Sequence, residues 1–472
     1  MDSKKKYLTL FSDTAAFTIS NFASKILVFL LIPLYTSVLT TEEYGVADLI
    51  TNTVNVVYPI LTLSVMEATL RFAFDKNVEK SEVLTNSLVI IGLSEIIVIL
   101  STPLVKYLSS DMAEYWGWFV IIYLGSNLQQ VLSQYAKGIG KTKEFAVSGV
   151  IQTIVIIVSN ILCLLVFNIG ISGYLFSIVA GYFATCLYLT LAGKIRITNI
   201  HVNMKLLRDM LKFSVPTIPT IVAWWISTSA DKYIIISYLG IASSGVYSVA
   251  YKIPSILTMF TTIFTSAWTL SAIQNVDKED NAQFHTIIYK YFNIANVLVC
   301  SILILLSKFL SSILFGKNFH AAWHYVPLLL VAYVFSGLAG FMASSFRAAK
   351  NTKGLFVSTV IGALLNIILN FYFIKKFGNM GAAFTTMLGF AVTFYIRIFG
   401  MKKIIDIKIE IVKDTIVYFL LIIQAFLISL EVMNAYILGI LILGLIIFLY
   451  RKSLIQVINI IWKLFLKMKR RK

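Results

Sequence analysis

The sequence predicts an all-α integral membrane protein with about 14 transmembrane helices, arranged as two parallel six-helix repeats followed by a C-terminal hairpin. Three observations predict this fold class: a strongly apolar composition, basic residues that alternate loop by loop, and stretches of the first half that recur in the second. The 472 residues are 58% hydrophobic and 13% charged, with a mean hydropathy of +0.85. A soluble domain of this size could not cover such a composition with polar surface.

Transmembrane helices are expected wherever roughly 20 apolar residues lie between charged or Gly/Asn-rich breaks. The connections between these apolar runs are short, so we expect no sizeable soluble domain on either side of the membrane. The expected spans lie near 13–38, 45–70, 83–107, 115–136, 145–168, 172–193, 214–239, 245–270, 286–315, 322–346, 355–376, 381–400, 414–431 and 434–450.

Basic residues separate the two sides of the membrane. When the loops are assigned alternately, about thirty Lys and Arg residues lie on one side and about five on the other, which is the positive-inside pattern. This bias places both termini in the cytoplasm. It also accounts for the formal net charge of +18, because a nucleic-acid-binding chain would gather its basic residues on a polar domain. We therefore expect membrane lipids and no nucleic acid as partners.

Two segments of the first half recur in the second. TEEYGVADLITNTVNVVYPILT (41–62) lies 200 residues before IASSGVYSVAYKIPSILTMFTT (241–262), and KTKEFAVSGVI (141–151) lies 210 residues before NTKGLFVSTVI (351–361). Six spans are an even number, so both halves enter the membrane in the same direction. Such parallel repeats place the substrate path between the halves.

The repeats divide the chain into four parts. The last part is a basic tail that predicts either an amphipathic helix on the anionic inner leaflet or a solvated run of charges. The parts are an N-terminal lobe (1–200), a C-terminal lobe (201–403), an extra transmembrane hairpin (404–450) and the tail (451–472).

Polar side chains follow one face of four expected spans, two from each half. Polar groups in hydrocarbon are expensive unless they face protein or water, so these stripes predict a cavity between the halves. The candidate cavity residues are Asn21, Lys25, Asp48, Asn52, Asn55, Trp224, Asp231, Lys232 and Lys252.

Asp231 and Lys232 stand side by side in the middle of the apolar stretch WWISTSADKYIIISYLG (224–240). Each would cost about 2.5–3.5 kcal/mol at the centre of a lipid-facing helix. Two interpretations remain open. The two charges face a water-filled interior, or Asp231 forms a structural ion pair with a lysine such as Lys252, which enters the membrane at a comparable depth.

The stretches NFASKILVFLLIPLYTSVLTTEEYGVADLI and VMEATLRFAF resemble the polysaccharide and oligosaccharide-lipid flippases of the multidrug/oligosaccharidyl-lipid/polysaccharide (MOP) exporter superfamily. ADKYIIISYLGIASSGVYSVAYKI resembles the same family where the second half begins. The resemblance implies two MATE-like lobes in a V shape around a cationic central cavity. Lys25, Lys232 and Lys252 match the kind of position at which such flippases carry basic residues. The second span differs, because it offers Asp48 and Asn52 rather than an arginine.

The resemblance also implies a function. The cargo would be an undecaprenyl-diphosphate-linked oligosaccharide repeat unit, moved from the inner to the outer leaflet of the bacterial cytoplasmic membrane. Polysaccharide polymerase and glycosyltransferases would be partners. No bond is made or broken, so we expect no enzyme activity, no cofactor and no metal, while protons, sodium or the membrane potential could each drive the step. The alternative is a cation-coupled multidrug or metabolite exporter, for which Glu95 or Asp231 could supply a buried acidic site.

Overall fold

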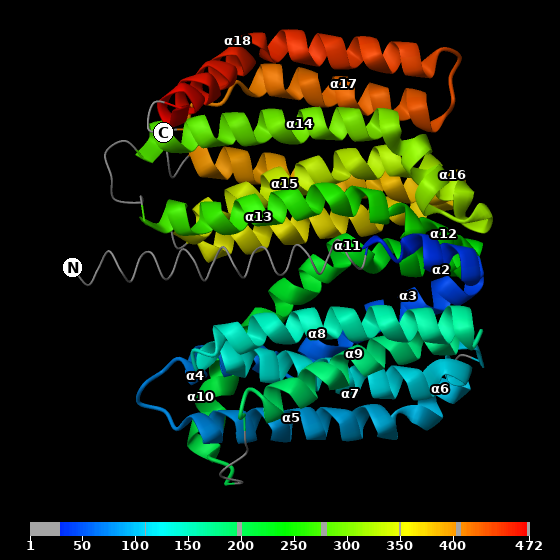
Figure 1. Ribbon diagram of the computed structural model, residues 1–472, viewed down its shortest axis with the longest axis vertical. Coiled ribbons are helices and arrows are strands. Elements are labelled where there is room, and N and C mark those ends of the chain that lie inside the picture. The colour runs from blue at the N-terminus through cyan, green and yellow to red at the C-terminus, as the bar shows by residue number, and fades with distance from the viewer. Residues whose placement is uncertain are drawn as a thin grey trace. The chain divides into compact units, whose positions relative to one another are not determined.

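The protein is helical throughout the part that the structure describes. A computed structural model describes residues 29–108, 110–195, 201–274, 281–348, 351–402 and 407–469, and these residues form helices and no strand (Figure 1). The chain divides into two compact units. One comprises Met1–Ser229 with Ile241–Gly245, and the other comprises Ala230–Gly240 with Val246–Lys472.

The helices follow the apolar runs of the sequence. The first unit is built from α2 (Ile32–Val38), α3 (Thr41–Leu61), α4 (Val65–Ala73), α5 (Lys80–Leu100), α6 (Thr102–Leu108), α7 (Ser110–Gly138), α8 (Thr142–Ile161), a π-helical turn (Leu162–Val166), α9 (Ile171–Leu191), α10 (Met204–Ser214) and a 3₁₀ turn (Val215–Thr217). α11 (Ile218–Leu239) and α12 (Ile241–Ala250) contribute to both units. The second unit continues with α13 (Lys252–Gln274), α14 (Asn281–Leu314), a 3₁₀ segment (Lys317–His324), α15 (Val326–Ala348), α16 (Thr352–Lys402), α17 (Ile411–Ser429) and α18 (Ala435–Lys469).

Eight helices among the described residues are long and apolar enough to cross a membrane, or nine if the bent pair α3–α4 counts as one span. The protein is therefore a multi-pass membrane protein, while the expected total of 14 spans stays a prediction. α3 and α4 meet at 64°. The bend follows Pro59, which lacks the N–H that would continue the ladder, and it occurs where Leu63 and Ser64 adopt left-handed backbone angles.

The internal duplication is visible in the backbone. α3 and α12 begin 200 residues apart, and α8 and α16 begin 210 residues apart, at the offsets that the sequence predicts. Gly170 has φ 64° and ψ −140°, and Gly378 has φ 59° and ψ −144°. This left-handed conformation favours glycine. Both residues open the last helix of a repeat, so the two halves share an unusual local geometry as well as a pattern of residues.

α15 is the central helix of the second unit. It contacts α13, α14, α16 and α17 (Figure 1), and 78% of its most apolar 18-residue stretch is buried. Such a helix is apolar on all sides because it has no face to present to lipid or water. α16 folds back on itself at Gly378 and holds two of the expected spans in one continuous element. The second of these spans therefore starts from a fixed turn at Gly378.

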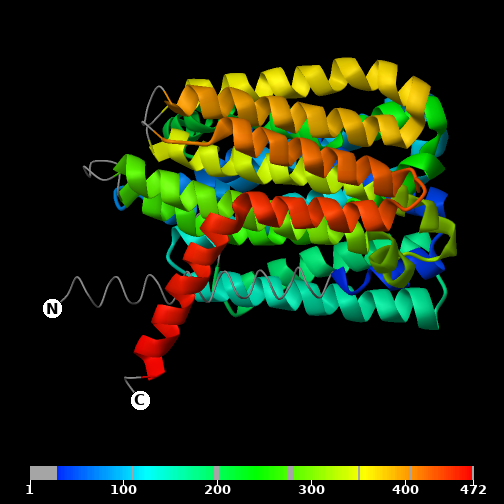
Figure 2. The ribbon, with the colours of Figure 1, turned by 90° about the horizontal axis from the view of Figure 1, so that it is seen from above.

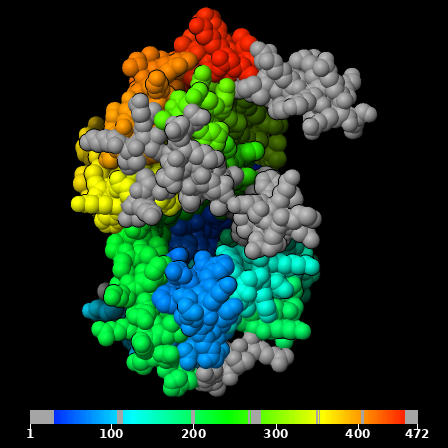
Figure 3. Space-filling model, turned by 90° about the vertical axis from the view of Figure 1, so that its left-hand side faces the viewer, coloured from blue at the N-terminus to red at the C-terminus, as the bar shows by residue number. Residues whose placement is uncertain are grey.

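The C-terminal hairpin forms an outer layer of the second unit. α17 and α18 pack on α14 and on each other, at the edge of this unit (Figure 3). α18 continues beyond the expected span as one helix to Lys469, and its last part turns away from the hairpin (Figure 2). The described part of the tail, 451–469, is thus helical, while its place on the inner leaflet stays a prediction.

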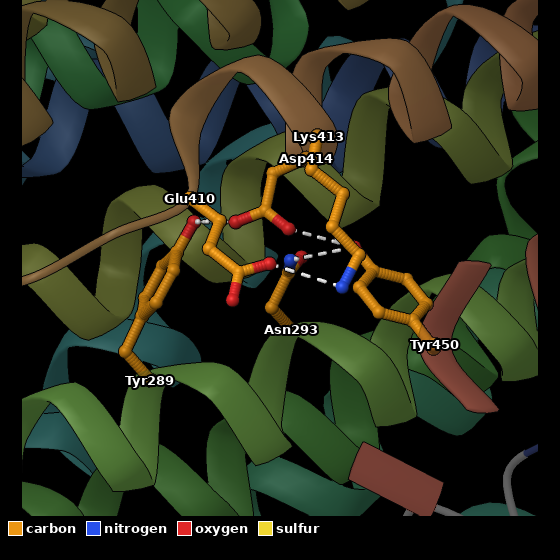
Figure 4. Close-up of polar contacts among 6 residues, drawn as sticks. All are labelled: Tyr289, Asn293, Glu410, Lys413, Asp414 and Tyr450. Atoms are coloured by element: carbon orange, nitrogen blue, oxygen red, sulfur yellow. Dashed lines mark hydrogen bonds and ion pairs between the residues drawn. The ribbon is translucent and has the colours of Figure 1, made fainter. Parts of the chain in front are cut away.

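A buried polar network joins the hairpin to α14 (Figure 4). The Tyr450 hydroxyl donates to a carboxylate oxygen of Asp414 at 2.8 Å and accepts from the Asn293 amide at 3.2 Å. Tyr418 donates to the Asn293 carbonyl oxygen at 2.8 Å, and Tyr289 lies 3.5 Å from Asp414. Apolar packing between helices brings little gain in lipid, so hydrogen bonds of this kind help to hold the hairpin in place.

We expect Tyr450→Phe to lower the free energy of unfolding by about 1–2 kcal/mol, because it removes a hydrogen bond to a buried carboxylate. Thermal unfolding of the purified full-length protein in detergent measures the change. Tyr436→Phe is the matched control, since Tyr436 lies on the same helix and is 44% exposed. Equal stabilities of the two variants would show that the network does not stabilise the hairpin.

Candidate functional site

The sequence-predicted site residues fall into two groups, one in each compact unit. Asn21 and Lys25 lie outside the described residues. Asp48, Asn52, Asn55 and Trp224 belong to the first unit, and Asp231, Lys232 and Lys252 belong to the second. A central cavity lined by both groups stays a prediction.

In the first unit, Asn52 connects α3 to α11. Its side-chain amide donates to a carboxylate oxygen of Asp48 at 2.8 Å. Its side-chain oxygen accepts from the Ser229 hydroxyl at 3.1 Å, and its backbone oxygen accepts from the Trp225 indole N–H at 3.0 Å. Polar residues of the expected second and seventh spans therefore meet directly within the first unit.

The start of α3 is determined by its sequence. Thr40 caps the helix by accepting from the Glu43 N–H, and the Glu43 carboxylate accepts from the Thr40 N–H. This reciprocal capping box satisfies two backbone donors. It fixes the residue at which α3 begins. Within this helix Asp48 and Asn52 are four residues apart and therefore share one face. Asn55 is exposed.

The sequence predicts Trp224 as a cavity residue, and this stays a prediction. Trp224 is 47% exposed, whereas its neighbour Trp225, which was not among the predicted site residues, donates to α3. One signal in the sequence could have found it: Trp225 lies four residues before Ser229, so both reach the same neighbour from one face of the helix.

In the second unit, the Asp231 carboxylate is buried and surrounded by hydroxyl groups. One of its oxygens accepts from Tyr251 at 2.7 Å, Tyr247 at 2.9 Å and Thr386 at 3.2 Å. The other oxygen accepts from the backbone N–H of Lys232 at 2.9 Å. A carboxylate that accepts several hydrogen bonds can keep its charge at low exposure.

This cluster brings together three separate segments of the chain. Asp231 lies on α11, Tyr247 and Tyr251 lie on and just after α12, and Thr386 lies on α16. The Lys232 ammonium sits 5.4 Å from the centre of the Tyr251 ring, within the range of a cation–π interaction. The predicted pairing of Asp231 with Lys252 stays a prediction.

Sequence reasoning offered only Lys252 as a partner and missed the three hydroxyl donors Tyr247, Tyr251 and Thr386. Tyr247 and Tyr251 are four residues apart and share one face, so their spacing was a usable signal. Thr386 comes from a helix more than 150 residues away, and no local pattern points to it. No three His, Cys, Asp or Glu side chains gather within the described ranges.

Two curated proteins are similar to this chain. One is a probable low-salt glycan biosynthesis flippase of Haloferax volcanii, 23% identical over 318 residues that span 66% of each protein. The other is an uncharacterized membrane protein of Methanocaldococcus jannaschii, 24% identical over 426 residues that span 84% of this chain and 99% of the relative.

Solved structures share the fold. A lipid II flippase, MurJ, in an inward closed conformation superposes with a TM-score of 0.71 at 19% identity, over 93% of this chain and 99% of that one. An inward-facing multidrug resistance MATE transporter of the MOP superfamily gives a TM-score of 0.63 at 14% identity, over 80% and 98%. The predicted MATE-like fold is thereby confirmed. Residues 10–268 match the polysaccharide biosynthesis protein family. With more than half of its length in that match, the chain belongs to the polysaccharide biosynthesis protein family.

Proposed function

We propose that this protein is a flippase that moves an undecaprenyl-diphosphate-linked oligosaccharide repeat unit from the inner to the outer leaflet of the bacterial cytoplasmic membrane. The step uses alternating access through a cationic cavity and supplies repeat units for surface polysaccharide synthesis. The observation that carries the proposal is the set of polar contacts on two expected membrane helices, Asp48–Asn52 on α3 and Asp231–Lys232 on α11, in a chain of the polysaccharide biosynthesis family.

The chemistry of the cargo fits these residues. A diphosphate is an anion that a lysine ammonium meets as a point charge. Lys232 is held against the Tyr251 ring beside a buried carboxylate, which keeps its position defined. Amide and hydroxyl groups such as Asn52 and Ser229 can hydrogen-bond to sugar. The lipid tail can stay in the bilayer while the glycan passes.

Location and partners follow from the same proposal. Both termini lie in the cytoplasm, where glycosyltransferases complete the lipid-linked unit. A polysaccharide polymerase consumes the product at the outer leaflet. The similarity to a glycan biosynthesis flippase supports a cargo of lipid-linked glycan.

An exporter of drugs or metabolites is the second candidate. The observation that favours it is the buried Asp231 carboxylate, because a cation-coupled exporter needs an acidic group that can bind a proton or sodium. Intramembrane lysines favour the flippase, since they attract an anionic cargo and repel the cationic compounds that many exporters carry.

A deletion strain separates the two candidates. We expect lipid-linked oligosaccharide to accumulate on the inner leaflet, measured by extracting the undecaprenyl-linked sugars and by labelling spheroplasts with an impermeant glycan probe. Surface polysaccharide should be lost at the same time. Unchanged lipid-linked sugars together with increased sensitivity to cationic drugs would support the exporter.

Neutralising Lys25, Lys232 or Lys252 to alanine should lower translocation roughly tenfold each, because each removes a charge-assisted contact to the anion. Complementation of the deletion strain measures the effect, and membrane levels of each variant check insertion. Lys76→Ala is the matched control, since Lys76 is exposed between α4 and α5. Full complementation by all three variants would disprove the cavity assignment.

A further inference from the structure

An open groove lies at one end of the second unit, where α16 ends and α17 begins. Its volume is about 580 Å³. Two of its aliphatic side chains are well exposed, Val412 at 77% and Ile416 at 51%. Exposed apolar surface of this kind marks a contact with a membrane or a partner. The apolar wall comes from α17, from the segment before it and from α18: Ile409, Ile411, Val412, Ile416 and Leu449.

Basic side chains surround this apolar wall. Lys402, the last residue of α16, and Lys413, in the first turn of α17, line the groove together with Glu410. Lys408 is exposed beside a lining residue, and Lys452 is exposed one helical turn beyond the lining residue of α18. Among the described side chains of the groove and its rim, four lysines therefore face one carboxylate, which makes the groove a site for an anion.

Hydrogen bonds hold the wall of the groove in place. The Lys408 backbone N–H donates to the Thr286 hydroxyl of α14 at 3.1 Å, which fixes the segment before α17. The Lys413 ammonium donates to a carboxylate oxygen of Glu410 at 3.0 Å and lies 5.0 Å from the centre of the Tyr450 ring (Figure 4). An ammonium has three N–H donors, so Lys413 can hold Glu410 and still donate to a ligand.

The groove lies near one boundary of the apolar layer. The apolar stretch of α17 starts at Ile411, and that of α18 ends at Gln456. The lysines gather at this end of the hairpin, whereas the turn at its other end, 430–434, carries Glu431 and no lysine or arginine. Anionic lipids give the cytoplasmic leaflet its negative potential, and basic pockets between membrane helices on that side bind their headgroups.

We propose that this groove binds an anionic phospholipid of the inner leaflet, with Lys402 and Lys413 donating to the headgroup phosphate and the aliphatic wall receiving the start of an acyl chain. A lysine ammonium meets a phosphate as a point charge, and an acyl chain covers the exposed Val412 and Ile416. All lining residues belong to the second unit. Binding does not depend on the proposed function, and only the choice of leaflet rests on the proposed placement of both termini in the cytoplasm.

The test is thermal unfolding of the full-length protein in a neutral detergent, with phosphatidylglycerol replacing phosphatidylcholine of the same acyl chains at constant total lipid and ionic strength. A ligand that binds only the folded state raises Tm in a saturable way, and we expect such a rise for the wild type. Lys402→Gln removes one charge-assisted contact and should raise the half-saturating phosphatidylglycerol concentration about tenfold. The double variant Lys402→Gln with Lys413→Gln should show no saturable rise.

Lys375→Gln is the matched control. Lys375 is an exposed lysine of the same helix, but it lies just before the turn at Gly378, at the opposite end of α16's two halves, so this variant should keep the wild-type response. The absence of a rise in the wild type, or a saturable rise that survives in the double variant, would overturn the site.

Two further lipid-free or charge-free probes check the class of ligand. An equal rise with phosphatidylcholine alone would overturn the role of charge, and an equal rise with inorganic phosphate would identify a free-anion site in place of a lipid site. Neither rise is expected. A deletion strain that behaves like that of an exporter would leave the phosphatidylglycerol response of the purified protein unchanged, so this proposal and the proposed function fail separately.

Discussion

Replacing Gly245 with alanine is expected to destabilise the protein by about 3 kcal/mol and to abolish its activity. A Cβ atom at Gly245 would lie 2.0 Å from the backbone oxygen of Thr41, and one at Gly45 would lie 2.3 Å from the backbone oxygen of Ile241. The two contacts are related by the 200-residue offset of the repeat. Equivalent helices, α3 and α12, thus cross backbone to backbone in a reciprocal contact, within the first compact unit.

Small residues permit such close crossings in membranes, where packing and weak hydrogen bonds replace the hydrophobic effect. Any side chain at Gly245 must separate the helices by more than an ångström, because the atom in the way is backbone and cannot rotate aside. Thermal unfolding in detergent and complementation of a deletion strain measure the two consequences.

Gly92→Ala and Gly117→Ala are the matched controls, because a Cβ atom at either helical position meets nothing within 4 Å. Both should be as stable as the wild type or more stable by up to about 1 kcal/mol. The double variant with alanine at Gly45 and Gly245 should cost less than the sum of the single variants, since one separation accommodates both methyl groups. Strict additivity would show that the two contacts are independent.

Much of the fold follows from the sequence because it rests on long periodic signals. Apolar runs locate the helices, and the duplicated segments predict helix starts that agree between the halves. The proline at position 59 predicts a bend in this region but not its angle. The angle depends on the left-handed backbone conformation of Leu63 and Ser64 and on the hydrogen bond that the Ser214 hydroxyl donates to the Leu63 carbonyl. α11 carries so many polar residues that its hydropathy alone does not identify it as a span.

The site could be predicted only along each helix. Helical spacing placed Asp48 with Asn52 and singled out Asp231, since these facts are local. It could not supply Thr386 as a partner of Asp231, because that contact depends on how α16 returns after Gly378.

Asp231→Ala should lower the free energy of unfolding by about 3 kcal/mol or more, because it leaves the hydroxyls of Tyr247, Tyr251 and Thr386 without their common acceptor. Each unsatisfied buried group costs about 1–3 kcal/mol. Tyr247 and Tyr251 can still hydrogen-bond to each other, as their oxygens lie 3.2 Å apart, which keeps the total below the sum. Transport should be lost, since the three segments that Asp231 joins are no longer held together.

The Asp231→Asn variant keeps the shape of the side chain and removes its negative charge. Asparagine keeps one oxygen as an acceptor for the hydroxyls, so thermal unfolding in detergent should place this variant between the wild type and Asp231→Ala. If the negative charge positions Lys232 for an anionic cargo, Asp231→Asn should also reduce complementation while its membrane level stays normal. Asp209→Asn, at an exposed position of α10, should stay within about 0.5 kcal/mol of the wild type and complement fully. A fully stable and fully active Asp231→Ala would refute both the structural and the functional role, because no other residue of α11 accepts these three hydrogen bonds in the described structure.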